Sequence, residues 1–277
     1  MFRHEASELL EQRRVQIDDV EICYGAAGVG RPLVLIHGLG GSSRWWVRNV
    51  QALARYYRVY CIDLIGFGDS RCAHPFALEE AAGWLAKWMN KMGLRRATVI
   101  GHSMGGYIAA DLAADYPHLV ERLILVNAAI MPIGNNVVQH CLALAKEARP
   151  GTLDLLPVFL RDAYRAGMKT LWKARNELCA SDIRHKLLTI QAPTLIIWGE
   201  KDALLPLEHG RALLKLIPNA KLVRVRGCGH TPLWERPIEV NRVMIDFLKP
   251  QKPARRPMTR AAAASQPSAA ATAQHTA

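Results

Sequence analysis

Apolar and polar positions follow two alternating patterns along most of the chain. Short apolar runs with strand character recur at LVLI (33–36), VYCI (59–62), TVI (98–100), LILV (123–126), TLII (194–197) and LVRV (222–225). Several are apolar throughout, as in parallel strands that are covered on both faces. Amphipathic helical patterns lie between most of these runs, at about 46–55, 79–92, 104–115 and 236–248. This alternation predicts an α/β fold with a mostly parallel sheet of about eight strands and helices on both faces.

One interval between the strand-like runs is much longer than the others, because residues 127–193 separate the fourth run from the fifth. Within this interval, 140–148 and 155–178 have amphipathic helical patterns, and Pro150 and Gly151 interrupt them. An ordinary crossover between parallel strands is far shorter. We therefore interpret the interval as a helical cap inserted into an otherwise continuous core.

The two ends of the chain differ from the core. Residues 14–17 and 20–24 predict an antiparallel hairpin with Asp18 and Asp19 at its turn. From Pro250 onward the chain is mainly Ala, Ser, Pro and Gln, which cannot bury enough area to offset the entropy lost on ordering, so we expect a disordered tail. The predicted organisation is an α/β core in 14–131 and 191–248, a helical cap in 132–190 and a tail in 250–277.

Composition narrows the class of protein. The chain has 277 residues, of which 50% are hydrophobic and 22% charged, a mix that supports a sizeable globular core. No apolar run reaches the roughly 18 residues that span a bilayer, and the charged N-terminus does not resemble a secretory signal. Six cysteines without metal-ligand spacing are typical of reduced thiols, which favours a cytoplasmic location.

The net charge of +12 does not by itself define a partner. Part of the excess lies in the Ala-rich tail, and we interpret the rest as a solvated basic surface. Contact with an acidic membrane surface is compatible with this charge, but no pattern in the sequence supports it. No nucleic-acid-binding motif is present, so we expect no nucleic-acid partner.

A glycine-flanked serine follows the run at 98–100. Residues 101–106 read Gly-His-Ser-Met-Gly-Gly and open a helix that is rich in alanine. A strand that turns sharply into a helix places Ser103 at an exposed tip, and Gly101 and Gly105 permit the close approach that this turn needs. The helix N-terminus directs free N–H groups and a positive dipole toward the serine. This context predicts that Ser103 is a nucleophile.

A second glycine loop follows the run at 33–36. It reads His-Gly-Leu-Gly-Gly-Ser over residues 37–42, and its small residues let the backbone approach a reacting carbonyl. We expect the N–H groups of Leu39 and Met104 to form an oxyanion hole. The loop lacks the spacing of a nucleotide-binding motif, and the proposed chemistry needs no metal or organic cofactor.

Two later loops supply an acid and a base. Residues 199–202 read Gly-Glu-Lys-Asp, and Asp202 can accept a hydrogen bond from an imidazole, with Glu200 as the local alternative. Residues 227–230 read Gly-Cys-Gly-His and present His230. Both loops follow predicted parallel strands, whose carboxyl ends form the edge where open α/β sheets bind ligands.

The order of these residues along the chain is informative. Ser103, Asp202 and His230 follow one another as nucleophile, acid and base, the order of α/β-hydrolases. The other candidate position for the acid, after the run at 123–126, holds the uncharged Asn127. Cys228 is a weak alternative nucleophile, because it lies only two residues from His230.

Together these motifs resemble the α/β-hydrolase fold superfamily, particularly its capped esterase and lipase members. The resemblance covers roughly residues 14–248. It includes the family's D-x-x-G-x-G-x-S loop, which is matched by Asp63, Gly66, Gly68 and Ser70. It implies an α/β-hydrolase fold with Ser103 as nucleophile, His230 as base and Asp202 as the group that orients it. It also implies that the 63–70 loop is structural and lines the entrance.

The resemblance favours hydrolysis of a small apolar carboxylic ester through an acyl-enzyme. Haloalkane dehalogenases and epoxide hydrolases carry an aspartate nucleophile, so Ser103 argues against both. C–C hydrolases of vinylogous diketones often carry proline where Gly41 stands here; this activity remains an alternative. A non-catalytic hydrolase-fold binding module is the third hypothesis. Candidates to line the pocket are Trp45, Trp46, Phe67, Met104, Met131, Trp172 and Trp234, with core packing as the alternative for each.

Overall fold

A computed structural model describes residues 10–70, 74–134, 136–147 and 151–249. In this part of the chain, eight strands form one sheet in the order β1-β2-β4-β3-β5-β6-β7-β8. They are β1 (Glu11–Ile17), β2 (Val20–Ala27), β3 (Arg31–Ile36), β4 (Tyr57–Ile62), β5 (Ala97–His102), β6 (Val120–Val126), β7 (Thr194–Gly199) and β8 (Ala220–Val225). Strand β2 pairs antiparallel with β1 and β4, and every other pairing is parallel, which confirms the predicted sheet.

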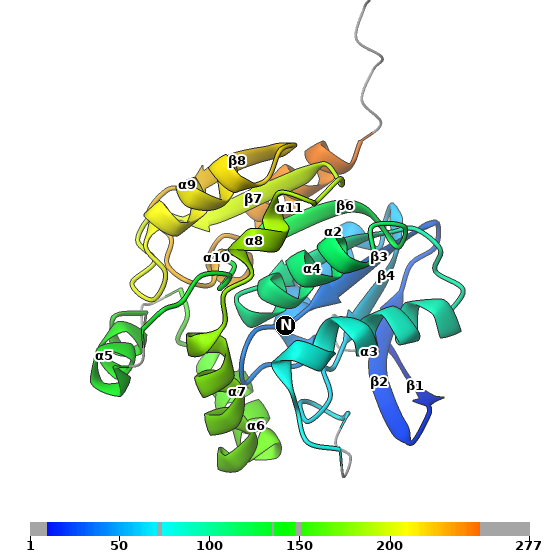
Figure 1. The fold of residues 1–277 in the computed structure, drawn as a ribbon, viewed down its shortest axis with the longest axis horizontal. Helices are drawn as coiled ribbons and strands as arrows, with labels where there is room; N and C mark the ends of the chain where they lie inside the picture. The colour runs from blue at the N-terminus through cyan, green and yellow to red at the C-terminus, as the bar shows by residue number, and fades with distance from the viewer. Residues whose placement is uncertain (1–9, 71–73, 135, 148–150, 250–277) are drawn as a thin grey trace, which may run out of the picture.

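Helices cover both faces of the sheet (Figure 1). One face packs on α3 (Leu78–Lys91), α4 (Met104–Asp115), α8 (Arg184–Leu187) and α9 (Leu207–Leu216). The other packs on η1 (Ser43–Trp46), α2 (Val47–Leu53), α10 (Pro232–Glu235) and α11 (Pro237–Leu248). Strand β3 shows why both faces are apolar: Val34 and Ile36 enter one core, while Leu33 and Leu35 enter the other.

The predicted hairpin and helices correspond closely to the observed ones. The hairpin turns at Asp18, whose φ is 53°, and the helix predicted at 104–115 has those bounds. The pattern at 46–55 forms η1 and the shorter α2 instead of one helix. The pattern missed α9, because Gly210 weakens its helical propensity. A Cβ on Gly210 would lie 2.9 Å from the ring of Trp198, so glycine is required there by packing.

The long interval between β6 and β7 contains α5 (Val137–Glu147), α6 (Leu156–Ala166), α7 (Met168–Ala180) and α8. Gly167, with φ of 77°, divides the continuous pattern expected at 155–178 into α6 and α7. These two helices lie side by side in the lower part of Figure 1. Helix α8 instead contacts α4 and α9 beside the sheet. The cap bounds at 132 and 190 stay a prediction, and the predicted tail lies outside the described residues.

None of the described helices combines the length and the apolar character needed to cross a bilayer.

Candidate active site

Ser103 lies at the sharp turn between β5 and α4. Its backbone has φ of 53° and ψ of −117°, which is a rare conformation for a residue with a side chain. The turn is fixed by a hydrogen bond from the Ser103 N–H to Val126 O (3.0 Å). A Cβ on Gly105 would lie 2.4 Å from the carbonyl oxygen of Ile36, so the helix can approach β3 only with glycine there.

The loops after β7 and β8 bring two further side chains to Ser103. His230 Nε2 lies 3.1 Å from Ser103 Oγ, and His230 Nδ1 lies 2.8 Å from Asp202 Oδ2. Both side chains are largely buried, so their interaction is weakly screened by water. The structure therefore joins Ser103, His230 and Asp202, which are far apart in the sequence, in one chain of hydrogen bonds.

The charges of this group are set by burial and by the hydrogen bonds of Asp202. Burial disfavours the ionised carboxylate, but His230 and hydrogen bonds from Leu205 and Asn127 outweigh it and lower the pKa of Asp202. Burial also disfavours protonated His230, but the Asp202 carboxylate outweighs it and raises the pKa of His230. Asp202 consequently holds the Nδ1–H tautomer of His230, which leaves Nε2 able to accept the Ser103 proton.

Asn127 supports the acid from the end of β6. Its Nδ2 donates to Asp202 Oδ2, and its Oδ1 accepts from the N–H of Gly199 at 3.1 Å. The backbone at Asn127 has φ of 43°, a conformation that asparagine tolerates better than most residues. Asn127, which stands where the sequence offered a second position for the acid, thus orients the Asp202 carboxylate after β7.

Three side chains, of which Glu147 and His102 are buried and Glu235 is half-buried, fix the loop of His230, and sequence reasoning missed their role. Glu147, at the end of α5, accepts from the N–H of His230 (2.8 Å) and from the N–H of Ala203 (2.7 Å). Glu235 accepts from the N–H of Gly229 at 3.0 Å. His102 Nε2 lies 2.9 Å from the carbonyl oxygen of His230. No local signal distinguished Glu147 from a solvated glutamate on a helix, since its partners lie more than 50 residues away.

His102 and His37, which we interpret as scaffold, are both buried. His37 Nε2 accepts from the N–H of Leu64 at 3.1 Å. Burial lowers the pKa of His102 to about 3, so it stays neutral while it holds the His230 loop. His102 also lines the cavity beside Ser103. The interpretation of His102 as scaffold did not predict this position.

Two backbone N–H groups are free to face a substrate oxygen. Leu39 lines the cavity, and Met104 begins α4 directly after Ser103. In the described residues, neither N–H donates a hydrogen bond to another protein group. Their assignment as an oxyanion hole stays a prediction.

The cavity beside Ser103 has a volume of about 350 Å³ and mainly apolar walls. Its lining includes the predicted residues Leu39, Trp45 and Trp172. Unpredicted lining comes from Phe159, Met168 and Leu171 on α6 and α7, together with Ile133, Val137, Arg175, Leu178, Cys179, Leu204 and Leu205. Sequence periodicity cannot show which face of these helices meets the cavity, because that depends on their tertiary placement.

Five candidates do not line this cavity, and for them the pocket interpretation is corrected. Trp46, Phe67 and Met104 are fully buried in the core. Trp234 donates from Nε1 to Asp154 Oδ1 at 2.9 Å and stacks under Arg48, with core atoms around it. Met131 is half-buried outside the lining. Core packing explains why four of these large side chains are present.

The other residues considered from the sequence have structural contacts. Asp63 accepts from the N–H of Ser43 at 2.6 Å, so its loop is structural, although the loop does not line the cavity. Cys228 is fully buried, and burial raises the pKa of its thiol, which removes it as a nucleophile. Glu200 accepts from the N–H of Gly227 at 3.1 Å and pairs with Arg224, away from His230.

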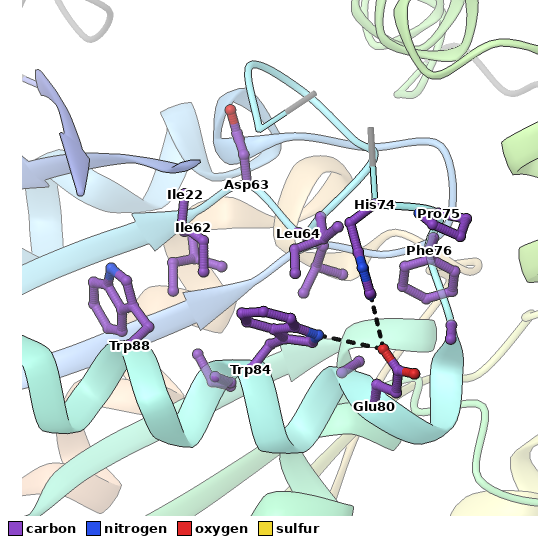
Figure 2. Close-up of a pocket in the computed structure, with 14 residues that line it drawn as sticks. Ile22, Ile62, Asp63, Leu64, His74, Pro75, Phe76, Glu80, Trp84 and Trp88 are labelled. Carbon is purple, nitrogen blue, oxygen red and sulfur yellow. Dashed lines mark hydrogen bonds and ion pairs between the residues drawn. The ribbon is translucent and has the colours of Figure 1, made fainter. Parts of the chain in front are cut away.

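A second hollow lies between α3 and the sheet (Figure 2). Figure 2 shows His74 and Trp84 both directed at the Glu80 carboxylate, with distances of 2.9 and 3.4 Å to Oε2. The hollow has a volume of about 20 Å³, which is room for a single water molecule. It therefore does not compete with the cavity at Ser103 as a substrate site. No group of three or more His, Cys, Asp or Glu side chains in the described ranges could hold a metal ion.

A serine hydrogen-bonded to a buried His–Asp pair, on a mostly parallel sheet, is the arrangement of the α/β class of serine hydrolases. Residues 33–243 match the model of the alpha/beta hydrolase family, so the chain belongs to this family. It is 30% identical to a 2-hydroxy-6-oxononadienedioate/2-hydroxy-6-oxononatrienedioate hydrolase of Burkholderia vietnamiensis, over 83% of this chain and 92% of that one.

Two further proteins are similar to this chain. The chain is 29% identical to a 2-hydroxy-6-oxo-6-phenylhexa-2,4-dienoate hydrolase of Comamonas testosteroni, over 84% of this chain and 93% of that one. It also resembles the crystal structure of a membrane phospholipase A described as a bacterial virulence factor, with a TM-score of 0.76 and 28% identity. That match covers 89% of this chain and 87% of the other. The relatives are thus hydrolases of small molecules and of lipids.

Proposed function

We propose that the protein hydrolyses carboxylic esters, with Ser103 as nucleophile, His230 as general base and Asp202 as the group that orients His230. The observation that carries this proposal is the hydrogen-bonded chain from Ser103 Oγ to Asp202 Oδ2 through His230, at 3.1 and 2.8 Å. A complete chain of this kind favours catalysis over the binding-module hypothesis. A cytoplasmic location stays a prediction from the cysteine and N-terminal patterns.

The reaction is a two-step acyl transfer. Ser103 Oγ attacks the ester carbonyl carbon while His230 Nε2 takes its proton, and the carbonyl oxygen becomes an oxyanion near the N–H groups of Leu39 and Met104. The C–O bond to the alcohol breaks as His230 returns the proton to the leaving oxygen. Water then attacks the acyl-serine by the same route and releases the carboxylic acid. Each oxyanion donor contributes about 3 kcal/mol of transition-state stabilisation.

The cavity supports an apolar acyl group. Its walls are mostly aliphatic and aromatic, so each methylene that enters it gains about 0.8 kcal/mol of transfer free energy. We expect kcat/KM for p-nitrophenyl esters to rise with acyl length by up to about fourfold per methylene until the cavity is filled. A p-nitroanilide and a vinylogous diketone serve as controls. Turnover of the diketone without turnover of any ester would overturn the proposal.

C–C hydrolysis of a vinylogous diketone is the second candidate. Arg175 lines the cavity, and a guanidinium there suits the carboxylate of an acidic substrate. The similarity to the two dienoate and dienedioate hydrolases points the same way. Arg175→Gln distinguishes the candidates, since it should raise the KM of an acidic diketone about tenfold or more while leaving neutral esters nearly unchanged.

The pH dependence follows from the pKa of His230. His230 must be neutral to accept the Ser103 proton, and its pKa is raised, so the protonated, inactive form persists to higher pH. We therefore expect kcat/KM to rise with pH through a midpoint above the ordinary histidine value of about 6.5. Initial rates on a neutral ester, measured over about four pH units from roughly pH 5 to 9, give this midpoint. A midpoint at or below the ordinary value would contradict the geometry.

Glu147 provides a matched variant for this measurement. Its negative charge is among the groups that raise the pKa of His230. Glu147→Gln removes that charge and keeps one of the two backbone contacts, so the midpoint should move to lower pH. Glu208→Gln, an exposed change on α9, should leave the midpoint unmoved. A purely structural role of Glu147 would lower the rate without moving the midpoint.

A further inference from the structure

The outer side of the α6–α7 pair carries large apolar side chains. Leu156, Leu160 and Tyr164 are four residues apart on α6, so they share one face. Leu160 is 57% exposed and Tyr164 is 88% exposed. On α7, Met168 and Trp172 are 77% and 51% exposed. We term these five exposed side chains the outer apolar face, because clusters of exposed apolar side chains often mark binding surfaces.

The buried side of α6 carries its acidic group. Asp162 is fully buried, and its Oδ2 accepts from Ser42 Oγ at 2.6 Å. Arg165 is half-buried and bonds to Asp69 in the core loop. A helix that only had to face water would show these charges outward and its leucines inward. The inner side of α6 also carries Val158 and Phe159, which pack against the core, so α6 is apolar on both sides. The leucines and the tyrosine left on its outer side therefore indicate that something other than water meets the outer apolar face.

The charges that do point outward beside this face are positive. Arg161 on α6 and Lys169 on α7 are exposed. The acidic groups near this face are already paired. Asp162 accepts from Ser42, Glu177 accepts from the N–H of Leu78, and Asp154 pairs with Arg48. Apolar side chains with a basic rim are complementary to anionic lipid headgroups.

The outer apolar face is continuous with the entrance to the cavity at Ser103. Met168 and Trp172 belong to both, because they line the cavity and are also more than half exposed. Figure 1 shows α6 and α7 projecting beyond the sheet, so this side can reach a flat surface. A molecule held in that surface would meet apolar side chains all the way from the outside into the cavity.

We propose that the outer apolar face docks on an anionic lipid surface, and that the ester substrate passes from that surface into the cavity. The inference about the substrate rests on the proposed ester hydrolysis, whereas docking does not. A second copy of the chain is a less suitable partner, because pairing this face with itself would bring the Arg161 and Lys169 side chains of two copies together.

Vesicle flotation with the full-length protein tests the docking. We expect binding to vesicles of equal parts phosphatidylglycerol and phosphatidylcholine, and much weaker binding to phosphatidylcholine alone. The double variant L160S/Y164S should lose about tenfold or more in affinity, because two exposed apolar side chains that would enter the lipid surface are removed. The variant R161E/K169E should lose a similar factor on the anionic vesicles only. None of these four residues lines the cavity.

Matched controls are available on other surfaces. Ile238, on α11, is 86% exposed, so Ile238→Ser removes an equally exposed apolar side chain far from the face. Lys215→Glu on α9 reverses an exposed charge elsewhere. Both should bind vesicles as the wild type does. All the variants should hydrolyse a water-soluble short-chain ester at the wild-type rate, which shows that they are folded.

The outcomes separate the two proposals. Wild-type protein that stays unbound with anionic vesicles, or L160S/Y164S that binds as well as wild type, overturns the docking. So does a wild-type dimer in sedimentation that L160S/Y164S converts to monomer without any vesicle binding. Vesicle binding with no hydrolysis of any ester instead overturns the proposed function and leaves the docking supported.

Discussion

Replacing Ser103 by alanine is expected to lower kcat/KM for the best p-nitrophenyl ester by about 10⁵-fold or more, because the attacking oxygen is lost. The variant should keep its fold, since among the described residues the Ser103 side chain bonds to His230 alone and the backbone hydrogen bonds of this position are unchanged. Steady-state rates, together with covalent labelling by a fluorophosphonate, measure the effect. Labelling should occur on wild-type protein and be absent from the variant.

Ser181→Ala is the matched control for this change. Ser181 donates to the carbonyl of Glu177 at 2.6 Å at the end of α7, outside the cavity. Its loss should leave both labelling and turnover near wild type. An alanine variant at 103 that remains as active as this control would show that another group is the nucleophile.

Replacing Asp202 by asparagine should lower kcat by about 10⁴-fold with little change in fold. The amide oxygen would take the place of Oδ1, where the N–H groups of Leu204 and Leu205 donate, so the NH2 group would face His230 Nδ1. The ring would then favour the tautomer that cannot take the Ser103 proton. The pKa of His230 would also fall, because the Asp202 carboxylate is what raises it against burial. Rates measured between neutral pH and pH 9 (about two units above neutrality) would show that the loss persists when His230 is neutral.

Glu200 provides the control variant for Asp202, because the sequence offered it as the alternative carboxylate to orient His230. Its carboxylate contacts the N–H of Gly227 and the side chain of Arg224. Glu200→Gln should therefore keep most of the activity. A larger loss in Glu200→Gln than in Asp202→Asn would reverse the assignment.

The sequence could predict the sheet, and also that the loops of Ser103, Asp202 and His230 lie at the same edge of it. Both predictions follow from local sequence patterns. Continuous apolar runs mark strands buried on two faces, and a glycine-rich turn after such a strand marks the edge where side chains converge. Gly105 illustrates this, since its lack of a Cβ is required by the distance to Ile36 O. The position of Asp202 after β7 follows for the same reason.

The lining of the cavity could not be predicted in this way. Trp46 and Trp234 are as large and apolar as Trp45 and Trp172, yet only the latter two reach the cavity. The difference depends on which side of η1, α7 and α10 meets the sheet, a tertiary property without a local signal. Helix α9 was missed because a packing requirement at Gly210 overrides helical propensity.

The contacts of Glu147 couple helix α5, which contributes to the cavity wall, to the loops that carry Asp202 and His230. Glu147 belongs to α5, whose Val137 lines the cavity, and it holds the N–H groups of His230 and Ala203. A displacement of α5 would therefore change the cavity wall at Val137 and also withdraw the carboxylate that holds both loops. The fit of the substrate and the rate of the chemical step would then change together.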